Sequence, residues 1–331
     1  MKKRSDGRYE RVVTVDGKRK AFYGKSPREV NRKILEYKGE QERGVPFKTV
    51  AWEWRTAHME KLSYGTQRAY NAPFLRLVDY WADKPIQDIN NKEVSYFFNN
   101  LNMSFKSAST HKTVLSQIFN YAIVECNIAI SNPCDRIKID SRLPRSHRGM
   151  TTDEQEKAIL ETTADEYLLA PLIYFTGMRC GEALALQYKD IDYDNKVISI
   201  TKSVTHHGNQ PVVGATKTAS GVRTVPLLPQ LEALIGRGEP NAYVIGGEKP
   251  NTKSALAKRW KRWEKDHGVT VDRHTIRHTY ASKLYEAGVG IKSSQELLGH
   301  ANAQTTLNIY THLNDNHVSE AAEKLGKILK P

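Results

Sequence analysis

The stretch LLGHANAQTTLNIYTH, residues 297–312, carries the pattern around which the rest of the sequence is organised. It places Tyr310 ten residues after His300 and two residues before His312. The chain contains 16 tyrosines, and a tyrosine is ordinarily a half-buried packing residue. Tyr310 therefore has a chemical role only if other parts of the chain supply the groups that a tyrosine nucleophile needs.

The composition indicates a multidomain protein with a polyanionic partner. A chain of 331 residues exceeds one ordinary core, so two or three domains are expected. Lys and Arg number 50 against 37 Asp and Glu, a net charge of +13 that favours nucleic acid over a membrane surface. A basic but otherwise ordinary enzyme is the alternative reading of the charge alone.

Membrane and secretory functions are not expected. No apolar run approaches the ~18 residues that a membrane helix needs. The basic start, MKKRSDGRYERVV, has no apolar stretch behind it and is not a secretory signal. The three cysteines form neither a disulfide framework nor a metal pattern, so we expect a reducing cytoplasm.

Residues 1–45 read as a small basic α+β module. They hold 14 Lys and Arg against 7 Asp and Glu, so +7 of the net +13 lies there. Strand patterns at residues 8–15 and 18–24 flank an Asp16-Gly17 turn, and a sheet face rich in cations can enter a DNA groove. We expect DNA contact rather than a solvated appendage. A helix should follow, with three start signals: Ser26 as N-cap, Pro27 and Glu29.

Residues 46–140 are helical in pattern, and residues 141–149, with a proline and several basic side chains, read as a linker. Apolar residues recur at three- and four-residue spacing in four segments, residues 49–62, 65–82, 91–101 and 107–125. The last segment carries a continuous apolar stripe that we expect to be core: Val114, Leu115, Ile118, Phe119, Ala122 and Ile123.

Residues 150–331 form the third and largest unit, which reads as α+β, mainly helical with a small antiparallel sheet. A capped helix begins near residue 151, and one helical stretch spans residues 166–187. Strand patterns at residues 195–204 and 221–228 interrupt the helices. The fold class expected is thus multidomain: a small α+β module, an all-α domain and an α+β domain.

Four stretches of this third unit carry side chains suited to phosphate chemistry. TGMRCGEALAL begins at residue 176, ATKTASGVRTVPL at residue 215 and HTIRHTYAS at residue 274; the stretch quoted first is the fourth. The candidate catalytic residues are Arg179, Lys217, His274, Arg277, His300 and Tyr310, with Glu182 in support.

Each candidate taken alone has an ordinary structural explanation. Arg179 and Glu182 could be a surface ion pair, and Lys217 one solvated lysine among many. His274 and His278 lie one helical turn apart, as two metal ligands can, but the sequence offers no HExxH pattern and no third ligand at a suitable spacing. We therefore expect no metal.

Together the candidates fit the cleavage of a phosphodiester. Two arginines can hold phosphate oxygens, over which negative charge spreads in the transition state. A histidine can transfer a hydroxyl proton near neutral pH, and a lysine can protonate the departing oxygen. A tyrosine hydroxyl, with an ordinary pKa of about 10, becomes a nucleophile when cations and a base surround it. Tyr310 meets that need.

In kind, order and spacing this set resembles the tyrosine recombinase, or phage integrase, family. The family's Arg, Lys, His-x-x-Arg, His and Tyr fall on the six candidates, and its acidic residue falls on Glu182. LGH at residues 298–300, followed by the T…Y.H ending, is among the family's most specific patterns. Lys202 remains an alternative to Lys217, because the hairpin that carries the family's lysine is variable.

The resemblance covers nearly the whole chain. Residues 46–140, with the opening SYGTQRAY and the closing Asn132-Pro133, are similar to the helical core-binding domain of the family. Residues 1–45 resemble the arm-type DNA-binding domain of its larger members. Residues 150–331 would then be the catalytic domain with its tail.

The resemblance implies a mechanism without cofactor or metal. Tyr310 would attack a scissile phosphate in duplex DNA, leaving a 3′-phosphotyrosyl link and a 5′-hydroxyl, and the 5′-hydroxyl of a second duplex would reseal the strand. Arg179, Arg277 and His300 would hold the phosphate oxygens. Lys217 would be the general acid on the leaving oxygen, and His274 would manage the proton of the nucleophile.

The partners that the resemblance implies are duplex DNA at core and arm sites, a homotetramer, a host DNA-bending protein and an excisionase. The gene would belong to a prophage or conjugative transposon of a bacterial host. The amphipathic tail, residues 317–329, would pack on a neighbouring protomer or in cis. The alternatives are a type IB topoisomerase-like enzyme and a non-catalytic DNA-binding regulator on the same fold. Target sequences and the direction of the reaction do not follow from the sequence.

Overall fold

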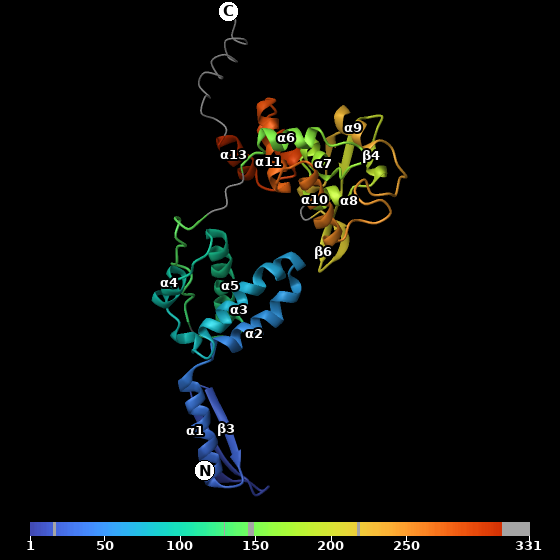
Figure 1. Cartoon of the computed structure of the whole chain (residues 1–331). Helices are drawn as coiled ribbons and strands as arrows, with labels where there is room; N and C mark the ends of the chain where they lie inside the picture. Colours follow the sequence, from blue (N-terminus) through green and yellow to red (C-terminus); the bar gives the residue numbers. More distant parts are fainter. Residues whose placement is uncertain (16–17, 129, 145–148, 217–218, 313–331) are drawn as a thin grey trace, which may run out of the picture. The chain divides into compact units, whose positions relative to one another are not determined.

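The computed structural model describes residues 1–15, 18–128, 130–144, 149–216 and 219–312, and only the backbone of residues 15, 18, 36–43 and 308–312. The chain divides into two compact units, Met1–Ser146 and His147–Pro331 (Figure 1). The finer division into three domains and a linker stays a prediction. Three predicted features lie outside the described residues: the Asp16-Gly17 turn, Lys217 and the tail at residues 317–329.

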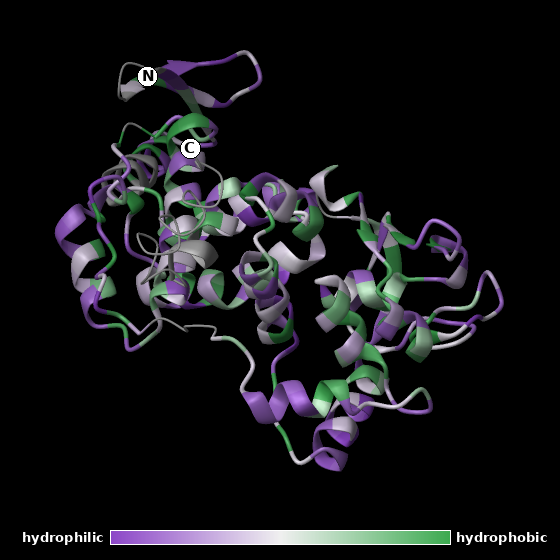
Figure 2. Ribbon diagram, turned by 90° about the horizontal axis from the view of Figure 1, so that it is seen from above, coloured by the Kyte–Doolittle hydropathy of each residue, from purple (hydrophilic) through white to green (hydrophobic). Residues whose placement is uncertain are grey.

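The first unit begins with a three-stranded antiparallel sheet, β1 (Lys2–Lys3), β2 (Tyr9–Val15) and β3 (Lys18–Gly24), followed by helix α1 (Pro27–Arg43). The hairpin beside the N-terminus is coloured mainly as hydrophilic (Figure 2). A small buried cluster of Phe22, Val30 and Ile34 joins β3 to α1. The β-rich module with one helix, predicted from residues 8–29, is confirmed in its elements.

The start of α1 differs from the predicted capping box in one bond. Ser26 Oγ accepts a hydrogen bond from the backbone N–H of Glu29 at 3.2 Å, as a capping serine should. The Glu29 carboxylate, however, accepts from the backbone N–H of Lys25 at 2.8 Å, one residue before the expected donor.

Four helices build the remainder of the first unit: α2 (Phe47–His58), α3 (Tyr64–Trp81), α4 (Asn91–Asn99) and α5 (Phe105–Val124), with 3-10 turns η1 (Met59–Lys61) and η2 (Ile86–Asp88). Ser63, Asn90 and Ser104 cap α3, α4 and α5 by accepting hydrogen bonds from the first turn. The predicted stripe of α5 is buried in the common core, except that Ile123 is only half-buried. These helices follow the four predicted segments closely.

The second unit is mainly helical with two small antiparallel sheets, where the sequence predicted one. β4 (Ile191–Asp192), β5 (Val197–Ile200) and β8 (Arg223–Pro226) form one sheet in the order β4-β5-β8, and β6 (Lys202–His207) with β7 (Gln210–Ala215) forms a hairpin. The helices are α6 (Asp153–Leu160), α7 (Leu169–Thr176), α8 (Cys180–Ala185), α9 (Pro229–Ile235), α10 (Lys253–Asp266), α11 (Arg273–Glu286), α12 (Ile291–Leu298) and α13 (Ala303–His312), with 3-10 turns η3 (Tyr188–Asp190) and η4 (Ala219–Gly221).

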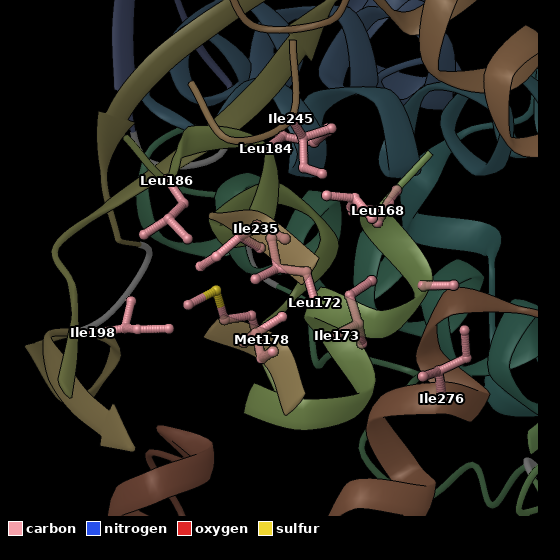
Figure 3. Packing of buried hydrophobic residues seen from close by; sticks show 14 of the residues in the cluster. Leu168, Leu172, Ile173, Met178, Leu184, Leu186, Ile198, Ile235, Ile245 and Ile276 are labelled. Carbon is pink, nitrogen blue, oxygen red and sulfur yellow. The ribbon is translucent and has the colours of Figure 1, made fainter. Parts of the chain in front are cut away.

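The single helix predicted for residues 166–187 is wrong, because Gly177 ends α7 in a left-handed conformation with φ +64°. The chain then passes through Met178 and starts α8 after Arg179. Met178 is fully buried and points into the core beside Leu172 and Ile173 (Figure 3). This anchored turn fixes the backbone from which Arg179 projects.

Candidate active site

Arg179 and Glu182 form a tight local pair at the start of α8. The backbone N–H of Arg179 donates to Glu182 Oε2 at 2.8 Å, and its Nη1 donates to Oε1 at 2.7 Å. The Arg179 side chain keeps 39% of its surface exposed, whereas that of Glu182 keeps 3%. The predicted pair therefore exists, with its carboxylate buried and its guanidinium partly open to solvent.

Arg277 reaches the same turn from α11. Its Nη1 donates to the carbonyl of Gly177 and its Nη2 to the carbonyl of Leu298. The residue is 8% exposed. Burial, together with the neighbouring charges of Arg179 and Arg223, lowers the pKa of Arg277 to about 9, although Glu182 acts in the opposite direction. The guanidinium thus stays charged at neutral pH.

Three arginines converge on three successive carbonyl groups at the end of α12. Arg223 Nε donates to Leu297 O at 2.7 Å, Arg277 Nη2 donates to Leu298 O, and Arg179 Nη2 donates to Gly299 O at 2.7 Å. The last carbonyls of a helix have no partner within it and carry partial negative charge, so cations are favoured there. Gly299 closes α12 in the left-handed conformation, with φ +63°.

Glu182 is the acidic centre of this cluster. Arg223 Nη2 donates to its Oε2 at 2.8 Å, in addition to the bonds from Arg179. Burial alone would raise the pKa of Glu182, but the hydrogen bonds and charges of the two arginines lower it below the ordinary value. The carboxylate is therefore ionised at neutral pH and balances one of the three guanidinium charges.

His300 follows directly after the third of these carbonyls. Its Nδ1 lies 3.0 Å from Oγ1 of Thr306, a fully buried residue of α13. Burial and the charges of Arg277, Arg179 and Arg223 lower the pKa of His300 to about 4. The imidazole is therefore neutral at pH 7. Tyr310 lies on α13, one turn after Thr306, and its side chain is outside the described part of the chain.

Two of the remaining candidates, His274 and Lys202, lie in the described part of the chain. His274 is exposed in the first turn of α11, where its backbone N–H donates to the N-cap Asp272 at 2.8 Å. Lys202, the alternative to Lys217, is held on β6 by Asp190 at 3.0 Å and by the Gln187 side chain at 2.8 Å. Lys217 belongs to the connection from β7 to β8, at an undescribed position.

Arg223 is the site residue that the sequence analysis missed. Its side chain is only 5% exposed, and it contacts both Glu182 and the end of α12. The signal was present in the alternation of β8: Arg223 shares a face with Val225, which is 1% exposed. An arginine on the inward face of a strand needs a buried partner, and here the partner is Glu182.

The cluster carries an excess of positive charge. Three guanidinium groups face one carboxylate, while the neutral His300 adds none. Buried cations without counter-ions are costly, so an anion bound beside them is strongly favoured. Among the described residues, no group of three or more His, Cys, Asp or Glu could hold a metal ion, and no helix is long and apolar enough to cross a membrane. What the geometry suits is a phosphate-sized anion.

Comparisons with known proteins identify the family of this chain. The model of the Phage integrase family matches residues 150–317. The chain is 32% identical over 277 residues to the ICEBs1 integrase of Bacillus subtilis, covering 76% of this chain and 74% of that protein. It is 30% identical to a XerC-like tyrosine recombinase of Caldanaerobacter subterraneus, covering 97% of this chain and 96% of that protein.

Solved structures share the fold. The Tn1549 transposon integrase in complex with transposon right end DNA superposes with a TM-score of 0.68 at 18% identity, over 86% of this chain and 100% of that one. A lambda integrase from a tetramer bound to a Holliday junction superposes with a TM-score of 0.58 at 19% identity, over 91% of this chain and 95% of that one. At these identities the likeness concerns the fold alone.

Proposed function

This chain belongs to the phage integrase family of tyrosine recombinases, site-specific enzymes that break and rejoin DNA, and we propose that it does so through a 3′-phosphotyrosine at Tyr310. The Tyr310 oxygen attacks the scissile phosphorus, a P–O bond forms, and the bond to the 5′-oxygen breaks. The energy of the phosphodiester is kept in the intermediate, so the 5′-hydroxyl of a partner strand can reverse the step on a new duplex.

The convergence of Arg179 and Arg277 beside His300 is the observation that supports this proposal. Each guanidinium has five N–H donors, and the described bonds use two in each, so donors remain for phosphate oxygens. Neutral His300, whose Nδ1 faces the Thr306 hydroxyl, offers Nε2–H as a further donor when that hydroxyl donates to Nδ1. These donors stabilise charge as it develops on the non-bridging oxygens.

Two proton-transfer roles complete the reaction. We assign the protonation of the leaving 5′-oxygen to Lys217 rather than Lys202, because Lys202 is already paired with Asp190. His274, exposed at the start of α11, takes the proton of Tyr310. Glu182 holds Arg179 in place and touches no reacting atom.

The rest of the chain binds DNA and assembles on it. In our proposal residues 1–45 bind arm sites, residues 46–140 bind the core site with the catalytic unit, and four protomers exchange two duplexes. The reaction integrates or excises a mobile element, with a host DNA-bending protein and an excisionase as accessory partners. The ICEBs1, Tn1549 and lambda integrases supply the analogy for this larger setting.

A covalent-adduct assay tests the proposal. The protein is incubated with nicked suicide duplexes that tile the DNA beside its gene, and denaturing electrophoresis separates protein linked to DNA. We expect an adduct from the wild-type protein and from Tyr193→Phe, a matched change at a tyrosine of the second unit whose hydroxyl donates to Gly236 O. Tyr310→Phe should give none. An adduct that persists in Tyr310→Phe would reject Tyr310 as the nucleophile.

The same assay separates the alternatives. A non-catalytic regulator would form no adduct on any duplex. A topoisomerase-like enzyme would form one and relax supercoiled DNA without a second site. Recombination that requires two cognate duplexes is the result expected of a site-specific recombinase.

A further inference from the structure

We propose that Arg223 is a positioning residue of the active site, which ties the Glu182 carboxylate to the end of α12 and thereby fixes Arg179 and His300. The inference rests on the proposed function, since it concerns the same site. Arg223 itself touches no reacting group; it acts through its neighbours.

The Arg223 guanidinium donates in three directions. Nη2 donates to Glu182 Oε2 at 2.8 Å, Nε to Leu297 O at 2.7 Å and Nη1 to Gly221 O at 3.1 Å. These partners belong to α8, to α12 and to the turn before β8. One side chain thus links three segments that are far apart in the sequence.

The burial of Arg223 separates its role from that of Arg179. The Arg223 side chain is 5% exposed and that of Arg179 is 39% exposed, although both donate to Glu182. A phosphate could therefore approach Arg179 from solvent, whereas Arg223 is enclosed and already paired with a carboxylate. Arg223 donates to Oε2 of Glu182, and Oε1 of the same carboxylate accepts from Nη1 of Arg179, so Arg223 can orient Arg179 through Glu182.

The turn that carries His300 is built against Arg223. A Cβ at Gly299 would lie 2.9 Å from Arg223 Nη1 and 3.2 Å from its Cδ. Gly299 O is also the acceptor of Arg179, and the next residue is His300. A shift of the Arg223 side chain therefore moves the turn that holds Arg179 and carries His300.

Arg223→Gln tests this role in single-turnover cleavage of a suicide duplex at saturating DNA. We expect the cleavage rate to fall on the order of 100-fold, as for a misplacement of about 1 Å. The affinity for DNA should change less than about twofold, because Arg223 is enclosed. Arg262→Gln, which removes an exposed arginine paired with Asp266, is the matched control and should cleave at the wild-type rate.

A double-mutant cycle with Glu182→Gln asks whether Arg223 acts through Glu182. When two residues work as one unit, the losses of activation free energy from the two single variants do not add. The double variant should therefore cleave no more slowly than the slower single variant. Losses that multiply, or an Arg223→Gln rate within twofold of the wild type, would overturn the proposal.

Two further measurements guard against a folding defect. Arg223→Lys keeps the buried charge, but its three N–H donors sit on one nitrogen and cannot reach the acceptors now bound by Nε, Nη1 and Nη2. We therefore expect the cleavage rate to fall about tenfold, with a folded circular dichroism spectrum. A wild-type rate for Arg223→Lys would contradict the need for the guanidinium. An NMR titration should show the pKa of His300 rising in Arg223→Gln and unchanged in Arg262→Gln, and an unchanged value in both would count against the coupling.

The failure of this inference differs from the failure of the proposed function. If Tyr310→Phe abolishes the adduct while Arg223→Gln cleaves normally, only the role of Arg223 is lost. If the wild-type protein forms no adduct at Tyr310, the proposed function itself is lost.

Discussion

Replacing Gly177 by alanine should disturb both the core and the active site. The added Cβ would lie 2.2 Å from Cδ1 and 2.6 Å from Cε1 of Tyr280, a ring that is itself buried. The left-handed backbone, with φ +64°, costs a residue with a Cβ about 1 kcal/mol. Moving the ring out of a packed core costs about 1–3 kcal/mol more. We therefore expect a loss of about 2–4 kcal/mol in the free energy of unfolding.

Gly288→Ala is the matched control. Gly288 also has a positive φ, +74°, but a Cβ at this residue would have no heavy atom within 4 Å. Only the backbone penalty applies, so the loss should be about 1 kcal/mol. Urea unfolding followed by tryptophan fluorescence, to which the buried Trp260 and Trp263 of this unit contribute, gives both values.

Gly177→Ala should also slow DNA cleavage, because the Gly177 carbonyl accepts a hydrogen bond from Arg277. A displaced Gly177 carbonyl would displace the Arg277 guanidinium. We therefore expect the cleavage rate in single-turnover assays to fall on the order of 100-fold. Equal losses of stability in Gly177→Ala and Gly288→Ala would refute the steric reasoning. Wild-type cleavage by Gly177→Ala would refute the link between this turn and Arg277.

Three further predictions concern His300, Thr306 and DNA. Because the pKa of His300 is lowered to about 4, the unfolded chain binds a proton that the folded chain does not; stability should fall as the pH drops from about 6.5 to about 4, by about 3 kcal/mol in all. Urea unfolding of His300→Asn should lack this part of the pH dependence. Parallel plots of stability against pH for the variant and the wild type would contradict the prediction. Thr306→Val removes the hydroxyl 3.0 Å from His300 Nδ1 and should slow cleavage by about tenfold, whereas the exposed neighbour Thr305→Val should not; equal rates would exclude the contact from catalysis. DNA affinity should fall steeply with salt concentration, since many phosphates are neutralised, and a flat response would argue against two DNA-binding units.

The local patterns of the sequence predicted most of the helices and strands, because helix periodicity and motif spacing depend on near neighbours. They also singled out Arg179, Arg277 and His300, which the structure brings together. The stripe from Val114 to Ala122 was recognisable as core from its spacing alone. The convergence of three arginines on the carbonyls of residues 297–299 was not recognisable from the sequence, because it depends on contacts between segments that are distant in the chain.

The errors have identifiable physical causes. The apolar run through residues 166–187 read as one helix, yet Gly177 could have been taken as a helix C-terminus. Arg223 was passed over because a single arginine in a basic chain is ordinarily solvated, and only the alternation of β8 marks it as inward-facing. The neutral state of His300 depends on burial beside three arginines, which no local pattern reveals.

The most direct test of the central claim is to find the atom that carries the DNA. Trypsin cuts after Lys292 and Lys324, and the peptide between them, residues 293–324, contains Tyr310 as its sole tyrosine. After nuclease digestion of the covalent adduct, mass spectrometry should find this peptide carrying a nucleotide phosphate on Tyr310. A nucleotide on any other residue, with the 293–324 peptide unmodified, would contradict the account.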